Sequence, residues 1–326
     1  MAKGKKKKER ETIKPDLSTR VGPLKLKNPV LAASGTFGYG LEFANLVDLN
    51  RLGGFVTKGL SLRPRAGNPP PRIHETSSGM LNSIGLHNIG VDEFLREKLP
   101  KLKKYDTAVI ANIYGETPED FVKVAQKLGD ASGLFGIEIN VSCPNVAKGG
   151  LDLGTDPEEV EKLVGKIRPV TQLPLLAKLT PNVTDIRSIA KAAINGGADA
   201  LSLINTIKGM AIDLEHRTPH LSSVRGGLSG PAIKPIALSM VYEVASQFDI
   251  PIVGIGGIST GKDALEFLVV GASAIQIGTQ NFVRSNATMT VLDEMTDYLR
   301  QHRINHVRDL VRSFSTFSSN PKRLAV

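Results

Sequence analysis

Residues 251–279 read PIVGIGGISTGKDALEFLVVGASAIQIGT, and this stretch contains the unit from which the whole fold is predicted to be built. Two short runs, Pro251–Gly256 and Ala274–Gly278, are almost continuously apolar. That pattern is typical of strands buried on both faces of a parallel sheet. Between them, Thr260–Val270 begins at a capping threonine and ends at Gly271, which predicts a helix. The stretch therefore predicts a strand, a helix and a second, parallel strand.

Similar apolar runs occur six more times upstream. They are Pro29–Ala33, Gly54–Lys58, Ala108–Asn112, Gly136–Val141, Pro174–Lys178 and Ala200–Asn205. Helical patterns with start or stop signals lie between several of them, at Phe121–Leu128, Val160–Ile167 and Asp185–Asn195. Eight strands that alternate with helices predict an α/β protein, a single-domain (β/α)8 TIM barrel with long βα loops at its active-site rim. An open doubly wound sheet is the alternative, and the number of strands favours the barrel.

The composition is that of an ordinary globular protein, with 41% hydrophobic and 22% charged residues among 326. No apolar run approaches the roughly 18 residues that a membrane span needs, and no apolar stretch follows the charged N-terminus as in a secretory signal. The one cysteine, Cys143, excludes an internal disulfide, an iron–sulfur cluster and a Cys-rich zinc site on this chain. We expect a cytoplasmic protein with no bound metal and no membrane contact.

The net charge of +9 is concentrated at the N-terminus, where the first 15 residues hold seven basic and two acidic side chains. Such a run can bind nucleic acid or acidic lipid, but like charges usually form a solvated, disordered tail. We expect a basic disordered tail over residues 1–20, a barrel over residues 21–310 and a C-terminal tail over residues 311–326. The remaining charge is too diffuse to predict a nucleic-acid partner.

Three long Gly/Pro-rich stretches, Ser61–Gly90, Ser142–Thr155 and Thr206–Ile233, follow the second, fourth and sixth predicted strands. We expect them to be irregular. In a barrel, the C-terminal ends of the strands share the rim on which active sites are built, and loops of this length are usually functional. The active site is therefore predicted at this rim.

Polar side chains stand where the apolar runs end: Lys58, Asn112, Asn140, Lys178 and Asn205–Thr206. A single strand end can be polar simply because it reaches solvent. However, lysine is rarely buried without a partner, and buried amides need hydrogen bonds. Two lysines and three asparagines that converge on one rim predict a site for a planar, partly anionic ligand with many hydrogen-bonding groups.

Glycines end the last two strands, at Gly256–Gly257 and at Gly278, which Thr279 follows. Exposed backbone N–H groups at such turns bind phosphate, and in many barrels these two loops hold one. Cys143 lies beyond the fourth strand in a polar loop, which favours a reactive role over that of a small buried hydrophobe. The residues alone leave open whether it is a nucleophile or a proton-transfer base, because histidines in the other long loops could activate it.

Several motifs together resemble dihydroorotate dehydrogenase. They are Asn-Val-Ser-Cys-Pro-Asn at 140–145, Thr-Lys-Gly at 57–59, Asn-Ser-Ile-Gly-Leu-His-Asn at 82–88, Gly-Gly-Leu-Ser-Gly-Pro-Ala-Ile-Lys-Pro at 226–235, Ile-Gly-Gly at 255–257 and Ile-Gly-Thr at 277–279. The resemblance runs in order from Val21 to Val283. It implies an FMN-containing (β/α)8 barrel that oxidises dihydroorotate to orotate in pyrimidine (UMP) biosynthesis. Cys143 and the motifs at 154–157 and 228–235 resemble the corresponding residues of the NAD-linked class 1B catalytic subunit.

The resemblance also implies roles for individual residues. It assigns FMN to Ser34, Lys58, Gly59, Asn112, Asn140, Lys178, Ile204, Gly230, Gly256, Gly257, Gly278 and Thr279. It assigns the substrate to Lys58, Asn82, Ser83, Ile84, Gly85, Leu86, Asn140, Asn145, Asn205 and Thr206. Cys143 is implied to be the base that removes the C5 proton while a hydride leaves C6 for flavin N5.

The class 1B resemblance further implies a homodimer associated with an electron-transfer subunit in a heterotetramer. That partner would carry FAD and a 2Fe-2S cluster, because one cysteine cannot ligate the cluster. Two alternatives stay open within enzymes: a class 1A-like homodimer that uses fumarate, and the related domain of dihydropyrimidine dehydrogenase. A flavin-free, phosphate-binding barrel that acts as a binding module is the alternative outside enzymes.

Overall fold

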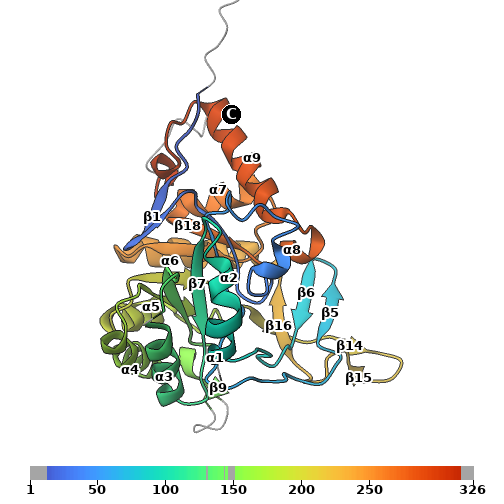
Figure 1. Cartoon of the computed structure of the whole chain (residues 1–326). Helices are drawn as coiled ribbons and strands as arrows, with labels where there is room; N and C mark the ends of the chain where they lie inside the picture. The colour runs from blue at the N-terminus through green and yellow to red at the C-terminus, as the bar shows by residue number, and fades with distance from the viewer. Residues whose placement is uncertain (1–12, 130, 143, 146–150, 317–326) are drawn as a thin grey trace, which may run out of the picture.

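The computed structural model describes residues 13–129, 131–142, 144–145 and 151–316, and its centre is a closed barrel of eight parallel strands (Figure 1). The strands are β3 (Val30–Ala32), β4 (Gly54–Val56), β7 (Ala108–Ile113), β8 (Gly136–Asn140), β11 (Leu175–Leu179), β12 (Ala200–Leu203), β17 (Ile252–Ile255) and β18 (Ala274–Ile277). They neighbour one another in chain order, and β18 pairs with β3 to close the ring. The predicted strands and the predicted (β/α)8 barrel are confirmed.

Helices surround the barrel, and their ends follow the local signals in the sequence. They are α1 (Val91–Glu93), which continues through a π-helical turn (Phe94–Lys98) into α2 (Leu99–Leu102), then α3 (Pro118–Gly129), α4 (Pro157–Ile167), α5 (Ile186–Asn195), α6 (Lys234–Gln247), α7 (Gly261–Val270), α8 (Gln280–Val283) and α9 (Ala287–His302). The Asp156 carboxylate caps α4, and Thr260 forms a capping box with Asp263 at the start of α7. None of the helices in the described ranges is long and apolar enough to cross a membrane.

A hairpin closes the N-terminal end of the barrel. It consists of β1 (Thr19–Val21) and β2 (Leu24–Leu26), which pair antiparallel. Its buried side chains Val21, Leu24 and Leu26 form one cluster with apolar side chains from the barrel strands, such as Ile110 and Leu176. The N-terminal half of the barrel interior is therefore an apolar core that the hairpin completes.

The chain is ordered beyond the boundaries that we drew for the two tails. Strand β1 begins at Thr19, and the backbone N–H of Asp16 donates to the carbonyl oxygen of Asn305 at 2.7 Å. At the other end, the backbone N–H of Arg312 donates to the carbonyl oxygen of Leu268 at the end of α7. Residues 16–20 and 311–314 thus belong to the folded domain, whereas residues 1–12 and 317–326 lie outside the described ranges.

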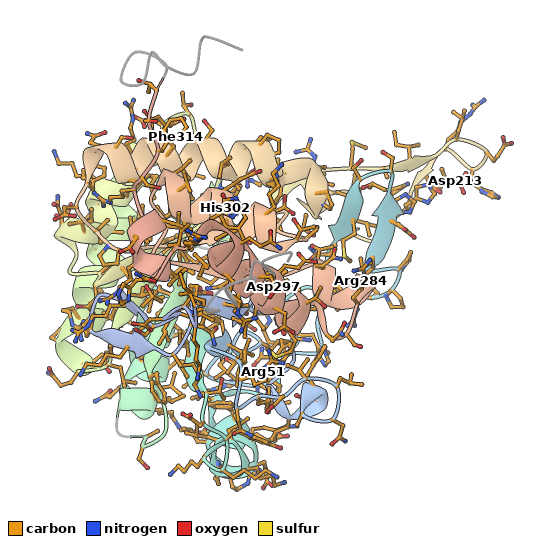
Figure 2. The ribbon with its side chains drawn as sticks, turned by 90° about the horizontal axis from the view of Figure 1, so that it is seen from above. Arg51, Asp213, Arg284, Asp297, His302 and Phe314 are labelled. Carbon is orange, nitrogen blue, oxygen red and sulfur yellow. The ribbon has the colours of Figure 1, made fainter. Side chains whose placement is uncertain are left out.

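The expectation that the long loops are irregular was wrong for part of their length, because each of them contains strands. Strands β5 (Ile73–Thr76), β6 (Gly79–Asn82), β13 (Ile207–Gly209) and β16 (Gly226–Ser229) form a four-stranded antiparallel sheet in the order β13-β16-β6-β5 (Figure 1). Two smaller pairs are β14 (Ile212–Asp213) with β15 (Thr218–Pro219), and β9 (Pro144–Asn145) with β10 (Leu151–Asp152). Asp213, in β14, projects away from the barrel (Figure 2).

The loops form this sheet because two of them pair with each other. Gly227 in β16 aligns with Asn82 in β6, which lies far away in the sequence. Strands rich in glycine have weak local patterns, so only the pairing defines them. The two loops together form a wall of the cavity at the C-terminal end of the barrel.

The hairpin at the base of the barrel can be tested by substitution. Leu24 is 4% exposed within the apolar cluster, whereas Lys25, its neighbour in β2, points to solvent. Leu24→Ala should lower the free energy of unfolding by about 2–5 kcal/mol, because it leaves a cavity in a packed core. Lys25→Ala should change it by about 0.5 kcal/mol or less. Urea unfolding of both variants checks this, and equal effects would show that the hairpin does not complete the core.

Candidate active site

A cavity of about 690 Å³ lies between the C-terminal ends of the barrel strands and the four-stranded sheet. The predicted flavin residues all line it: Ser34, Lys58, Gly59, Asn112, Asn140, Lys178, Ile204, Gly230, Gly256, Gly257, Gly278 and Thr279. So do most of the predicted substrate residues, namely Asn82, Ser83, Ile84, Gly85, Leu86, Asn205 and Thr206. Cys143 lies outside the described residues, and so does the side chain of Asn145. The structure thus brings together every described residue that the sequence singled out.

A hydrogen-bonded cluster around Glu138 forms the floor of this cavity. Glu138 lies in β8 and is fully buried. One of its carboxylate oxygens accepts a hydrogen bond from Asn112 Nδ2 at 2.8 Å, and the other accepts one from Gln276 Nε2 at 2.7 Å. Lys178 Nζ lies 3.7 Å from Glu138 Oε1. Since β8 and β18 are not neighbours in the ring, the bond to Gln276 crosses the barrel interior.

The interior of the barrel therefore has two layers. The apolar cluster fills the N-terminal half, and the polar cluster lies above it, because side chains two residues further along each strand point the same way. On β11, for example, Leu176 belongs to the apolar layer and Lys178 to the polar one. Asn112 and Lys178 line the cavity, whereas Glu138 and Gln276 support them from below.

Two asparagines in the wall of the cavity are held in place by a hydrogen bond between their side chains. Asn140 Oδ1 accepts hydrogen bonds from Asn205 Nδ2 at 3.1 Å and from the backbone N–H of Ser142 at 3.3 Å. Asn205 Oδ1 in turn accepts one from the backbone N–H of Thr206 at 2.8 Å. The oxygen of Asn140 is used within the protein, and its amide nitrogen, which has no partner among the described residues, can donate to a ligand.

Lys58 gives the cavity a positive charge. Its ammonium lies 3.5 Å from His87 Nδ1, and its backbone N–H donates to the carbonyl oxygen of Gly38. Burial lowers the pKa of Lys58 from its usual value, and the nearby Arg72 guanidinium lowers it further. Burial likewise lowers the pKa of His87, with Lys58 adding to the effect. An anionic ligand placed here would relieve this repulsion between cations.

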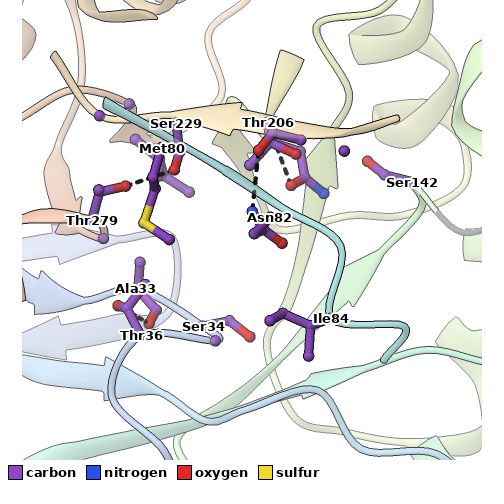
Figure 3. A pocket seen from close by; sticks show the side chains of 18 of the residues that line it. Ala33, Ser34, Thr36, Met80, Asn82, Ile84, Ser142, Thr206, Ser229 and Thr279 are labelled. Atoms are coloured by element: carbon purple, nitrogen blue, oxygen red, sulfur yellow. Dashed lines mark hydrogen bonds between the residues drawn. The ribbon is translucent and has the colours of Figure 1, made fainter. Parts of the chain in front are cut away.

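Residues from distant segments face one another across the cavity (Figure 3). Ser34 and Thr36 come from the segment after β3, whereas Asn82 comes from β6 and Thr206 from the segment after β12. Asn82 Nδ2 donates to the carbonyl oxygen of Gly227, which ties β6 to β16 within the wall. The cavity is thus enclosed from several directions, as small-molecule sites usually are.

The glycine turn after β17 lies beside the cavity and packs closely against the start of α6. Gly257 has a φ of 69°, and a Cβ atom there would lie 2.7 Å from Lys234 Cβ and 2.9 Å from the carbonyl oxygen of Gly230. Only glycine fits this crowded, left-handed position. Nearby, Thr279 Oγ1 donates to Ser229 Oγ at 2.8 Å (Figure 3). Backbone N–H groups and hydroxyl groups are ligands that phosphate prefers, so this corner fits the phosphate of a mononucleotide.

Sequence reasoning missed Glu138 and Gln276. Both stand inside short apolar runs, Gly136–Val141 and Ala274–Gly278, which we interpreted only as strands. A signal was present, because Glu138 precedes Asn140 by two residues and therefore points to the same face of its strand. Ser229 was missed as well, since it lies in a stretch that was expected to be irregular.

Comparisons with known proteins agree with this geometry. The sequence pattern of the dihydroorotate dehydrogenase family matches residues 16–299. The chain is 54% identical over 298 residues to a dihydroorotate dehydrogenase B (NAD(+)), catalytic subunit, of Geotalea daltonii, which covers 91% of this chain and 98% of the relative. The protein of the same name from Thermoanaerobacter sp. strain X514 is 55% identical with the same coverage. The chain belongs to the dihydroorotate dehydrogenase family.

Proposed function

We propose that the chain oxidises (S)-dihydroorotate to orotate with FMN as its bound cofactor. The observation that carries this proposal is the cavity itself, which combines a glycine-built phosphate corner with lysine and asparagine side chains at its floor and wall. The chemistry of this donor set fits both ligands. FMN offers a phosphate and a ring edge rich in hydrogen-bonding atoms, and dihydroorotate offers a carboxylate, carbonyl groups and ring N–H groups.

Residues in different parts of the cavity would bind the two ligands. Gly257, Gly278 and Thr279 would hold the phosphate, while Lys178 and Asn112 on the floor would face the edge of the flavin ring. When bound, the flavin supplies the acceptor for a hydride from C6 of the substrate. A cationic side chain at the ring edge stabilises the negative charge that the reduced flavin carries.

The substrate would lie against the sheet that the two long loops form. Lys58 attracts its carboxylate, and Asn140 and Asn205 hold its ring through amide groups that already fix each other. Cys143 lies three residues after Asn140 in the sequence, and we assign it the proton from C5. Loss of that proton and of the hydride from C6 leaves the C5–C6 double bond of orotate. The bonded asparagine pair would hold the substrate in place for such a base.

We further propose that the electrons pass to NAD through a partner subunit that carries FAD and a 2Fe-2S cluster, with the complex located in the cytoplasm. The names of the relatives support this, since they are catalytic subunits of NAD-linked enzymes. The single cysteine of this chain agrees, because a 2Fe-2S cluster needs several cysteine ligands. Two copies of each subunit would make the heterotetramer.

The cofactor can be identified directly. Purified protein should be yellow and should release FMN, and no FAD, when it is denatured and the supernatant is analysed by chromatography. Gly257→Val should retain much less FMN than wild type, because the new side chain would collide with Lys234 and Gly230 and displace the backbone that forms the phosphate corner. Gly165→Ala, at a helical glycine with open space around it, is the matched control. Protein that binds FAD, or that binds no flavin after reconstitution, would refute the assignment.

The role of Cys143 can be tested by two substitutions. Cys143→Ala should slow flavin reduction by dihydroorotate by at least about 10²–10⁴-fold, the usual contribution of a general base. Cys143→Ser should give a slow enzyme whose rate rises with pH, because a hydroxyl group is a much weaker acid than a thiol with its pKa of about 8.5. Stopped-flow measurement of flavin reduction checks both. Wild-type rates in Cys143→Ala, or a stable covalent adduct on Cys143 in mass spectrometry, would contradict the role.

The electron acceptor can be tested with the purified chain. Without a partner, dihydroorotate should reduce the flavin, but little NADH should form when NAD is added. Addition of a separately purified partner that carries FAD and a 2Fe-2S cluster should restore NADH formation. Rapid turnover with fumarate by the chain alone would instead place it in the class that needs no partner.

A further inference from the structure

Glu138 combines a buried charge with a position directly beneath two residues that line the cavity. It is 0% exposed, and its partner Lys178 has a side chain that is 9% exposed. A buried carboxylate is costly unless opposite charge and hydrogen bonds compensate it. In this structure Lys178 supplies the charge, and Asn112 and Gln276 supply one hydrogen bond to each carboxylate oxygen.

We propose that Glu138 is a positioning residue for the flavin site: its carboxylate orients the Asn112 amide and the Lys178 ammonium toward the cavity and offsets part of the ammonium's charge. This inference rests on the proposed function, because it assumes that the flavin ring edge faces these two residues. It adds a residue that does not line the cavity and that acts only through two that do.

The orientation of Asn112 follows from the chemistry of its partner. An ionised carboxylate can only accept hydrogen bonds, so the Asn112 amide must turn its nitrogen to Glu138 and present its oxygen elsewhere. That oxygen faces the segment after β4, since a Cβ atom on Gly59 would lie 3.0 Å from it. Gly59 lines the cavity as well, so the amide oxygen is offered as an acceptor at its edge.

The effect on Lys178 is electrostatic. Its ammonium is 3.7 Å from a carboxylate oxygen, in a buried place where charges interact more strongly than in water. The polar groups on the neighbouring strands, Asn140 and Ser202, are neutral, as is Gln276 across the barrel. The other cationic side chains that line the cavity are Lys58, Arg65 and Arg225. Glu138 is therefore the group that limits how strongly Lys178 can attract negative charge on the flavin.

A purely structural role for Glu138 makes a different prediction. Gln276 is the matched control, because it is fully buried, shares a hydrogen bond with Glu138 and does not line the cavity. If Glu138 merely fills the barrel, Glu138→Gln and Gln276→Met should both lower the thermal midpoint and should both leave the bound flavin unchanged. If Glu138 acts on the flavin through Lys178, only Glu138→Gln should change the flavin's redox equilibrium.

The experiment measures the midpoint potential of bound FMN in wild type, Glu138→Gln and Gln276→Met. Removal of the carboxylate's charge should favour the anionic reduced flavin at least tenfold, a rise of about 30 mV for two electrons. Gln276→Met should shift the equilibrium less than about threefold. An unchanged or lowered potential in Glu138→Gln, or an equal rise in Gln276→Met, would overturn the proposal.

A second measurement covers the case in which Glu138→Gln does not fold with flavin. Thermal unfolding of the flavin-free proteins should show that the Glu138→Gln/Lys178→Met double variant is more stable than the sum of the two single effects predicts, since neither charge is then left unpaired. Failure of the double variant to recover stability would overturn the charge pairing. This cycle needs no flavin, so it stays informative if wild type binds no FMN and the proposed function itself is wrong.

Discussion

The buried carboxylate of Glu138 is the constraint on which the active-site end of this barrel depends. A charge that is fully removed from water must be compensated, and here the compensation comes from residues on three other strands. Asn112, Lys178 and Gln276 are thereby held in fixed orientations. Two of these three residues form the floor of the cavity, so the geometry of the floor follows from the need to satisfy one carboxylate.

The two ends of the barrel have separate tasks. At the N-terminal end, the hairpin β1–β2 completes an apolar core that contributes to stability and carries no chemistry. At the C-terminal end, charged and amide side chains replace the apolar ones, and the sheet from the two long loops covers them. Burial of the polar layer by itself lowers the stability of the folded barrel. The apolar core at the N-terminal end compensates for this cost, because it holds the strands in place.

Much of the fold and the site could be predicted because the signals are local. Each barrel strand is a short apolar run, and Lys58, Asn112 and Lys178 stand where such runs end. The four-stranded sheet could not be predicted, since the pairing of β6 with β16 joins segments whose own patterns are weak. Glu138 was not predicted because a single polar residue within an apolar run does not show in the sequence that it points into the barrel. Its hydrogen-bond donors come from other strands, which only the closed barrel brings together.

A crystal structure of the chain with FMN and orotate would show whether Glu138 organises the flavin site. The flavin phosphate should lie against Gly257, Gly278 and Thr279, and the ring edge against the Asn112 amide oxygen and the Lys178 ammonium. Glu138 should remain bonded to the nitrogens of Asn112 and Gln276 beneath the ring. A phosphate bound at another part of the cavity, or a Glu138 carboxylate turned away from Lys178 when flavin is present, would contradict it.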